Sequence, residues 1–287
     1  MSVTILKGTI VSAPALGKLE ITENGYLVAR DGRIEGVYPV LPEQYARAFV
    51  EDFGSDLILQ TFADLHLHAP QYPMLGMGMD LPLLDWLNAY AFPTEARFAD
   101  PDYAREVYRL LSRDLAACGT TRVCMFSSLH TDATLILMEE LEKAGITGFV
   151  GKVNMDRNSA PGLLQETTEE SRRETLRWLE ACQDFPHIKP ILTPRFIPSC
   201  TDGLMTFLGK LAQERGLPAS PPVGKPGGDG LGPAAASGLR PVLGGLRQVR
   251  PLERAYADGP LCLVRSAGAR RHAGLRRDHG SLSWTPI

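Results

Sequence analysis

Three features that would assign a chain to a special class are missing from these 287 residues. No apolar run approaches the roughly twenty residues that a membrane-spanning helix needs. The N-terminal residues lack the basic and apolar layout of a secretory signal. The five cysteines are scattered without a C-x-x-C pair, which argues against a disulfide framework and against a cysteine zinc site. We therefore expect a cytoplasmic protein without a membrane partner.

The charge balance changes sign along the chain. Residues 1–218 contain 20 Lys and Arg against 29 Asp and Glu, whereas residues 219–287 contain 10 against 4. The second segment also has 12 Gly and 8 Pro, with one Tyr and one Trp. A basic arm could bind nucleic acid, but this composition and the lack of sustained periodicity favour an unstructured tail. We expect no nucleic-acid partner.

Short β-prone runs separated by turn signals occupy residues 1–56. Among the turn signals are Asn24-Gly25 and Asp31-Gly32, dipeptides that favour two-residue hairpins. The pattern predicts a small antiparallel β module at the start of the chain.

Two histidines separated by one residue follow the apolar run 57–62. In a strand, alternate side chains share a face, so His66 and His68 would project together while Leu65 and Leu67 pack behind them. Two converging imidazoles suit a divalent metal such as zinc. The spacing alone is equally compatible with two ordinary histidines at the end of a strand.

Strand and helix signals alternate through the region 57–218. After the histidine strand, the Pro- and Gly-rich residues 69–80 predict a loop, and loops at strand carboxyl ends carry the binding groups of α/β enzymes. Further strands are predicted at 120–126, 147–153 and 188–193, and helices at 81–90, 103–117, 131–144, 168–182 and 202–215. These β-α units predict an α/β fold, the first half of a (β/α)8 barrel over residues 57–218.

Distinctive segments surround the histidine pair. They are Asp64-Leu65-His66-Leu67-His68-Ala69-Pro70-Gln71-Tyr72, Asp80-Leu81-Pro82-Leu83-Leu84-Asp85-Trp86-Leu87 and Phe92-Pro93-Thr94-Glu95. Further segments are Gly119-Thr120-Thr121, Gly151-Lys152-Val153, Thr167-Thr168-Glu169-Glu170-Ser171 and Thr193-Pro194-Arg195-Phe196. From about residue 4 to Pro218, the chain resembles the guanine deaminases of the amidohydrolase superfamily.

The resemblance implies a zinc cofactor and a purine substrate. His66 and His68 match the first two zinc ligands. The positions that match substrate-contacting segments are His68, Ala69, Pro70, Gln71, Arg195 and Phe196. The implied reaction is the hydrolytic deamination of guanine to xanthine and ammonia by a zinc-activated water. The family also implies a possible homodimer.

Three of these positions have suitable chemistry for a purine. Gln71 can offer both a donor and an acceptor, Arg195 can hydrogen-bond a carbonyl oxygen, and Phe196 can stack on a ring. Each also has an ordinary interpretation, with Gln71 as a loop residue, Arg195 as a strand-end surface residue and Phe196 as a core residue.

The chain departs from the family pattern after Pro218. The family completes its metal site with a histidine in a Ser-His-Leu-Ser-Glu-Asn segment, whose Glu shuttles protons, and with a later His and Asp. No such segment occurs here, so we assign no catalytic residue. The remaining histidines have no matching context, and we expect surface or helix-cap roles for them: His130, His187, His272 and His279.

A reading-frame change would explain this departure. Codons for residues 222–233, read one base later, can encode Leu-Ser-Glu-Asn and the residues that follow it in the family. We therefore predict that residues 219–287 are an out-of-frame tail, which sequencing of the gene would test.

Two functional hypotheses remain. One is a zinc-dependent guanine deaminase by descent, although we expect this exact chain to be inactive. The other is a catalytically inactive fragment that binds purine or metal weakly. Another deaminase or chlorohydrolase of the same superfamily is the alternative substrate class.

Overall fold

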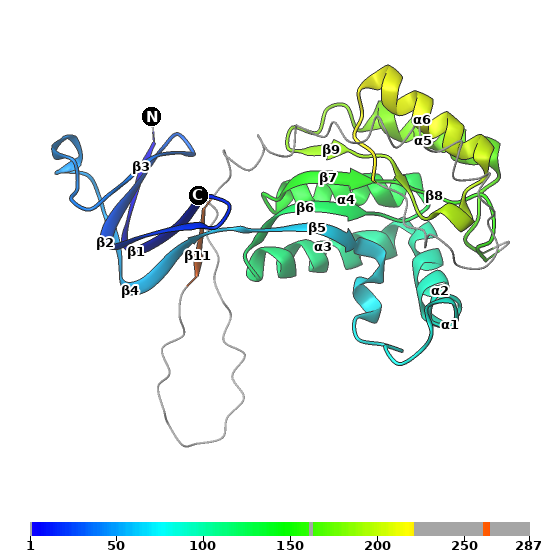
Figure 1. The fold of residues 1–287 in the computed structure, drawn as a ribbon, viewed down its shortest axis with the longest axis horizontal. Helices are drawn as coiled ribbons and strands as arrows, with labels where there is room; N and C mark the ends of the chain where they lie inside the picture. Colours follow the sequence, from blue (N-terminus) through cyan, green and yellow to red (C-terminus); the bar gives the residue numbers. More distant parts are fainter. Residues whose placement is uncertain (1, 161–162, 221–260, 265–287) are drawn as a thin grey trace. The chain divides into compact units, whose positions relative to one another are not determined.

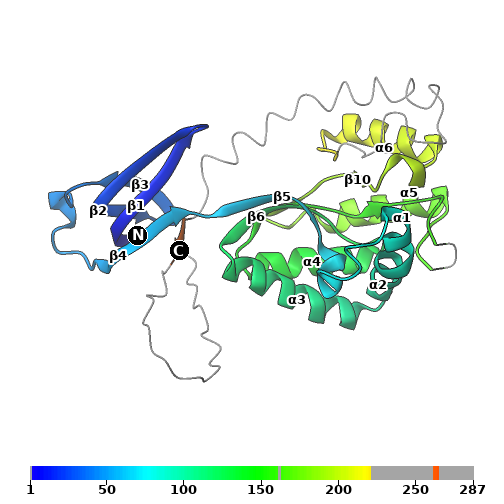
Figure 2. The same ribbon diagram turned by 60° about the horizontal axis from the view of Figure 1, so that its bottom comes forward.

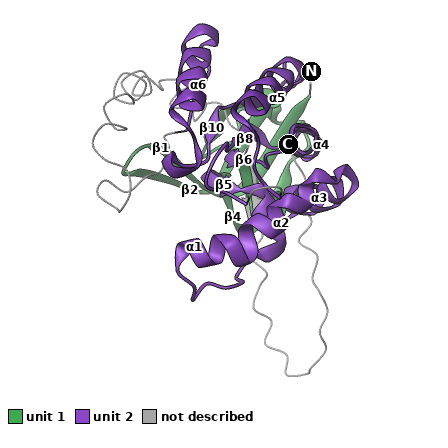
Figure 3. Ribbon diagram, turned by 90° about the vertical axis from the view of Figure 1, so that its right-hand side faces the viewer, with its two compact units in different colours: residues 1–62, 116–121, 251–287 green, residues 63–115, 122–250 purple. Residues whose placement is uncertain are grey.

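A computed structural model of the chain describes residues 2–160 and 163–220 and the backbone of 261–264. By their contacts, the residues group into two units, which are coloured separately in Figure 3. Unit 1 comprises 1–62, 116–121 and 251–287, and unit 2 comprises 63–115 and 122–250. The first division falls after Phe62, later than the residue 56 expected from the sequence, because residues 57–60 pair within the sheet of unit 1. No helix in the described part of the chain is long and apolar enough to span a membrane.

Unit 1 is built on a five-stranded sheet with the order β11-β4-β1-β2-β3. The strands are β1 (Val3–Ala15), β2 (Lys18–Arg30), β3 (Arg33–Tyr38), β4 (Glu51–Gln60) and β11 (Leu261–Val264). The neighbours β1, β2 and β3 pair antiparallel, but β4 pairs parallel to β1. The prediction of a small antiparallel module over residues 1–56 is therefore wrong for β4, which pairs parallel to β1. The connection 39–50 contains the 3-10 helix η1 (Glu43–Tyr45). It is long enough to bring the chain back across the sheet, so that β4 runs in the same direction as β1.

One of the two hairpin predictions is confirmed and the other is wrong. Asp31 and Gly32, with φ of 49° and 77°, connect β2 to β3. Asn24, with φ of 50°, lies inside β2, where the pairing with β1 shifts its register beside Gly25. The strand accommodates an extra residue there as a β-bulge instead of turning back.

Unit 2 contains the predicted strand and helix alternation. Its main sheet has the order β5-β6-β7-β9, and two short strands, β8 and β10, form a separate parallel pair. The strands are β5 (Phe62–His68), β6 (Thr120–Phe126), β7 (Thr147–Gly151), β8 (Val153–Asn154), β9 (Ile188–Pro190) and β10 (Thr193–Pro194). The pairs β6–β7 and β7–β9 are parallel. The predicted α/β fold with a partial, barrel-like parallel sheet is confirmed.

Four long helices accompany these strands. They are α3 (Pro101–Ala117), α4 (Thr131–Lys143), α5 (Thr168–Ala181) and α6 (Asp202–Arg215). In Figures 1 and 2, α3 and α4 lie beside β6 and β7, and α5 lies beside α6. Helix α6 ends as predicted at Gly216, whose φ of 62° is the left-handed conformation that glycine adopts most easily.

The segment between β5 and α3 is more helical than the sequence suggests. It contains the 3-10 helix η2 (Ala69–Met74), α1 (Leu83–Trp86), the π-helical turn η3 (Leu87–Ala91), α2 (Phe92–Ala96) and the 3-10 helix η4 (Arg97–Ala99). The loop predicted over 69–80 is therefore wrong for its first six residues. A short 3-10 helix tolerates proline near its start, and Pro70 occupies such a position.

The main core of unit 2 packs the helices against the sheet around Tyr108 and Trp178, both 0% exposed. Leu67 of β5 packs against this core, but Leu65 is 53% exposed. The prediction that both leucines pack behind the histidines is therefore wrong for Leu65. Strand β5 is the end strand of the described sheet, so it is covered less completely than β6 or β7.

Most of the expected tail lies outside the described residues, namely 221–260 and 265–287. Residues Leu261–Val264 are described as strand β11, which pairs antiparallel with β4. For these four residues the prediction of an unstructured tail is wrong. His272 and His279 lie outside the described part, so the roles expected for them stay predictions.

Candidate functional site

The two histidines lie together at the carboxyl end of β5. Their ring centroids are 5.2 Å apart and their planes meet at 79°. His68 stacks on Phe126, the last residue of β6, at 4.6 Å, and His66 meets the same ring edge-on at 5.4 Å. The alternation of side chains along the strand therefore places both imidazoles on one side, as the sequence predicted.

The environment of His68 fits a metal ligand. Burial, together with the positive charge of Arg195 and electrostatic repulsion from the neighbouring His66, lowers the pKa of His68 to about 3, so the imidazole of His68 is neutral at neutral pH. Its Nδ1 atom is buried and has no hydrogen-bond partner among the described residues. A neutral imidazole nitrogen of this kind is the ligand that zinc takes.

The histidine pair accounts for only part of a catalytic metal site. Among the described residues, no group of three or more His, Cys, Asp or Glu side chains is placed to hold a metal ion. A catalytic zinc usually takes three protein ligands and a water. His66 and His68 therefore fit two positions of such a set.

A buried carboxylate joins two of the predicted substrate-binding residues. Glu95 is 1% exposed and Arg195 is 6% exposed. Nη1 and Nη2 of Arg195 donate to the two oxygens of Glu95, with Nη2 at 2.8 Å from Oε1. Gln71 Nε2 donates to the same Oε1 at 2.9 Å. We call Gln71, Glu95 and Arg195 the purine-edge cluster.

Three elements distant in sequence bring this cluster together. Gln71 is on η2, directly after the histidine strand, and Glu95 is on α2. Arg195 follows β10, and its backbone N–H donates to the carbonyl of Asn154 at the end of β8, at 3.2 Å. Phe92, also on α2, lies under the guanidinium at 5.4 Å from its ring centroid, a favourable cation-π arrangement. Arg195 is thus a buried residue and not the strand-end surface residue that the sequence left open.

The other predicted substrate positions have simpler surroundings. Ala69 is 0% exposed within the main core, and Pro70 is also buried. They set the path of the chain from His68 to Gln71. Phe196 is half-buried, and its carbonyl accepts hydrogen bonds from the N–H and the hydroxyl of Ser199.

Glu95 is the residue that the sequence reasoning missed. It ends the segment Phe92-Pro93-Thr94-Glu95, whose resemblance to the family pattern implies no role for the carboxylate. The chemistry of Arg195 could have indicated this residue. An arginine in a protein interior needs an acidic partner, and in the structure that partner is Glu95.

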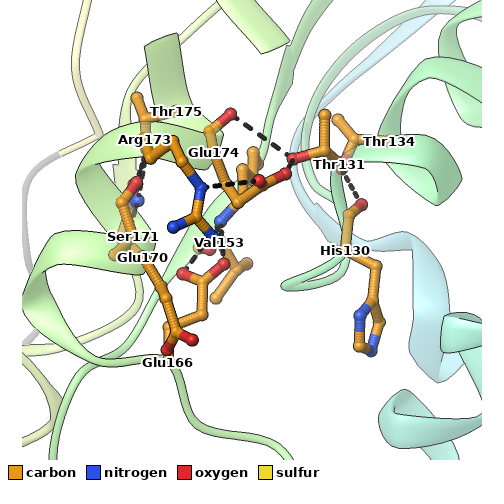
Figure 4. A network of polar contacts seen from close by, with 12 residues as sticks. His130, Thr131, Thr134, Val153, Glu166, Glu170, Ser171, Arg173, Glu174 and Thr175 are labelled. Carbon is orange, nitrogen blue, oxygen red and sulfur yellow. Dashed lines mark hydrogen bonds and ion pairs between the residues drawn. The ribbon is translucent and has the colours of Figure 1, made fainter. Parts of the chain in front are cut away.

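A second buried ion pair lies between β7 and α5. Lys152 is 0% exposed, and its Nζ donates to Glu166 Oε1 at 2.9 Å, to Glu166 Oε2 at 3.0 Å and to the carbonyl of Val153 at 3.3 Å. Burial lowers the pKa of Lys152 and raises the pKa of Glu166. Figure 4 shows Glu166 near Glu174, whose carboxylate accepts a hydrogen bond from Thr131 at 2.9 Å.

The remaining described histidines differ from one another. His130 occupies the N-cap position of α4, but its side chain makes no capping bond, and its ring points away from the carboxylates in Figure 4. The helix-cap prediction is therefore right for its backbone position and wrong for its side chain. His187 is exposed, as predicted, and its Nδ1 lies 2.9 Å from Glu142.

Comparison with known proteins places this geometry in a family. The model of the family described as "Amidohydrolase family" matches residues 57–220. The chain belongs to the amidohydrolase family. Metal dependence is a property of this family. The match covers all the residues predicted to bind metal or purine, although it assigns no role to any of them.

This amidohydrolase is similar to guanine deaminases in sequence and in fold. It is 47% identical over 164 residues to the guanine deaminase of Mus musculus and 37% identical over 232 residues to that of Dictyostelium discoideum. The matches cover 56% and 74% of this chain. A crystal structure of guanine deaminase from C. acetobutylicum with bound guanine has 43% identity and a TM-score of 0.73 over 76% of this chain. The resemblance identified in the sequence is confirmed.

The matches cover a limited share of the relatives. The chain spans 36% of the Mus musculus protein, 51% of the Dictyostelium discoideum protein and 52% of the C. acetobutylicum chain. The activity and substrate of those proteins are therefore carried to this chain only as a proposal.

Proposed function

We propose that this chain carries the purine-recognition part of a guanine deaminase, with His66 and His68 as two ligands of a zinc ion. The observation that supports this most directly is the purine-edge cluster beside His68. The reaction of the corresponding complete site is the hydrolysis of guanine to xanthine and ammonia. Guanine is proposed as the substrate because the similar C. acetobutylicum structure is described with guanine bound in its active site.

The residues of the cluster have separate tasks in this proposal. Gln71 presents its amide to one edge of the purine, and Arg195 donates to a carbonyl oxygen or ring nitrogen. Phe196, next to Arg195, offers a ring face for stacking. A bound zinc ion would lower the pKa of a water molecule and so supply the nucleophile for hydrolysis.

The second candidate function is that of an inactive fragment that binds purine. It is favoured by the absence of a Ser-His-Leu-Ser-Glu-Asn segment from the sequence and of a third metal-binding side chain near His66 and His68 among the described residues. Binding and turnover are therefore separate predictions. We expect the full chain to bind guanine and zinc and to release no ammonia.

Metal analysis, equilibrium dialysis with guanine and an ammonia-release assay test this proposal on the full chain. We expect close to one zinc per chain after equilibration and removal of free metal, and retention of radiolabelled guanine in equilibrium dialysis. The H66A/H68A variant should lose zinc, whereas H187A, a control at an exposed histidine, should keep it. Zinc bound equally by both variants would contradict the ligand assignment. Ammonia release from guanine would overturn the inactive-fragment candidate, and a chain that binds no guanine would overturn purine recognition.

A further inference from the structure

We propose that Glu95 is a positioning residue that sets the hydrogen-bonding pattern and the charge that Gln71 and Arg195 present to a purine. This inference rests on the proposed function, because it concerns how the same site chooses its ligand. It assigns a recognition role to a carboxylate that lies behind the residues expected to touch the substrate.

The first step concerns the amide of Gln71. An ionised carboxylate only accepts hydrogen bonds, so the contact of 2.9 Å to Glu95 Oε1 requires the NH2 group of Gln71 to face Glu95. The amide carbonyl Oε1 then points away from the carboxylate. Glu95 therefore leaves Gln71 with an acceptor for a ligand. The amino group and the ring N–H of guanine are donors that match it.

The second step concerns the guanidinium of Arg195. A guanidinium has five N–H donors in a rigid plane. The paired contact with Glu95 takes one N–H from each of Nη1 and Nη2 and holds that plane in place. Donors remain for a carbonyl oxygen or a ring nitrogen of the ligand. A ligand that presents donors next to an acceptor fits Gln71 and Arg195 together.

The third step concerns charge. Glu95 and Arg195 are both more than nine-tenths buried, so water screens them little, and their charges cancel locally. A neutral purine can approach this pair without meeting an unbalanced charge. Xanthine is a stronger acid than guanine and forms an anion in mildly alkaline solution. An unpaired Arg195 would attract that anion, so Glu95 favours the neutral purine.

Two substitutions separate the effect of the charge of Glu95 from the effect of its side-chain length. E95Q keeps the size of the side chain but removes the charge, and it allows the amide group of Gln71 to rotate by about 180°. E95D keeps the charge but is shorter, so it can hold Arg195 without reaching Gln71 equally well. E140Q is the matched control, because Glu140 is also a buried carboxylate of unit 2, 6% exposed, and is paired with Lys143 and Arg105.

The experiment is equilibrium dialysis of the full chain and its variants with radiolabelled guanine and xanthine in mildly alkaline buffer, with circular dichroism as the check of folding. In E95Q we expect the ratio of guanine affinity to xanthine affinity to fall about tenfold, the effect of one charged hydrogen bond. In E95D guanine should bind about threefold more weakly, an effect smaller than that of one such bond, whereas xanthine, which lacks the amino group that Gln71 accepts from, should keep its wild-type affinity. E140Q should match the wild type in both affinities.

The outcomes distinguish this inference from the function on which it rests. If Glu95 had a purely structural role, its substitution would lower the affinities for guanine and xanthine by the same factor. A folded E95Q with an unchanged ratio of the two affinities therefore overturns the positioning role and leaves the proposed function standing. If E95Q does not fold, E95D decides, because either wild-type guanine affinity or an equal loss of affinity for guanine and xanthine in E95D overturns the positioning role. A wild-type chain that binds neither purine overturns the proposed function together with this inference.

Discussion

The two buried ion pairs of unit 2 differ in how much hydrogen-bonding capacity they leave unused. Lys152 has three N–H donors, and all three contacts, to Glu166 Oε1, Glu166 Oε2 and the Val153 carbonyl, are internal. Arg195 has five donors, of which the paired contact with Glu95 takes two. The first pair is saturated by its own surroundings, and the second retains donors beside the histidine strand.

This difference separates a structural role from a recognition role. A lysine is a compact charge that a carboxylate and one carbonyl can satisfy, whereas the planar guanidinium has edges that face different directions. The purine-edge cluster includes a third side chain, Gln71, whose amide orientation is set by the carboxylate. The Lys152–Glu166 pair is therefore expected to matter for stability, and the purine-edge cluster for binding.

The largest effect is expected for K152M, which tests the saturated pair. The substitution leaves the largely buried carboxylate of Glu166, 12% exposed, without its cation, and removing one partner of a buried pair typically costs about 3 to 5 kcal/mol in the free energy of unfolding. Urea unfolding followed by circular dichroism measures this loss. The double variant K152M/E166L should regain most of it, because an apolar pair leaves no charge buried.

A matched control for this prediction is K143M. Lys143 is largely exposed, and its partner Glu140 also contacts Arg105, so the loss should be within about 1 kcal/mol. Equal losses in K152M and K143M would show that burial does not distinguish the two lysines and would contradict the comparison.

A smaller effect, on binding, is expected for Q71L. Glu95 stays paired with Arg195 in this variant, so the free energy of unfolding should fall by about 1 kcal/mol, the contribution of one hydrogen bond. The affinity for guanine should fall about tenfold. Urea unfolding and equilibrium dialysis measure the two quantities. Q165L, at another half-buried glutamine of unit 2 that accepts from Ser159, is the control and should bind guanine like the wild type.

Guanine affinity that falls equally in Q71L and Q165L would remove the distinction between the purine-edge cluster and its surroundings. Loss of stability in Q71L as large as that in K152M would do the same, because it would make the purine-edge cluster a structural one.

The smallest effect concerns the pH dependence of stability near the Lys152–Glu166 pair. Burial acts to raise the pKa of Glu174, but hydrogen bonds from Arg177 and Thr131 outweigh it and lower the pKa below its ordinary value of 4.5. A carboxylate with a lowered pKa in the folded state stabilises the fold above that ordinary value and loses this contribution as the pH falls through the folded pKa.

We therefore expect E174Q to lose less stability than the wild type on acidification from neutral pH to below 4.5, the ordinary value for this carboxyl. Thermal unfolding temperatures measured across this pH range test the prediction. The fall in unfolding temperature should differ between E174Q and the wild type by at most a few degrees. E180Q, at an exposed position on the same helix, should retain the wild-type dependence. Parallel curves of unfolding temperature against pH for E174Q and the wild type would contradict the role of Glu174.

Local signals predicted most of unit 2. Strand β6 and helix α6 have the bounds expected from their apolar periodicity and from Gly216. Such elements are encoded within a few neighbouring residues, so one sequence suffices to find them. Asn24-Gly25 shows the limit of this approach. A dipeptide suited to a hairpin forms a bulge when the strands on both sides continue their pairing.

The sequence by itself determined the family, the α/β alternation and the placement of His66 and His68 on one side of a strand, because each depends on residues close together in the chain. Only the tertiary structure decided that Gln71 and Arg195 meet through Glu95. A buried ion pair forms where three distant segments converge, and periodicity carries no information on that convergence. The same reason explains Leu65, since the exposure of a strand residue depends on which segments cover its sheet.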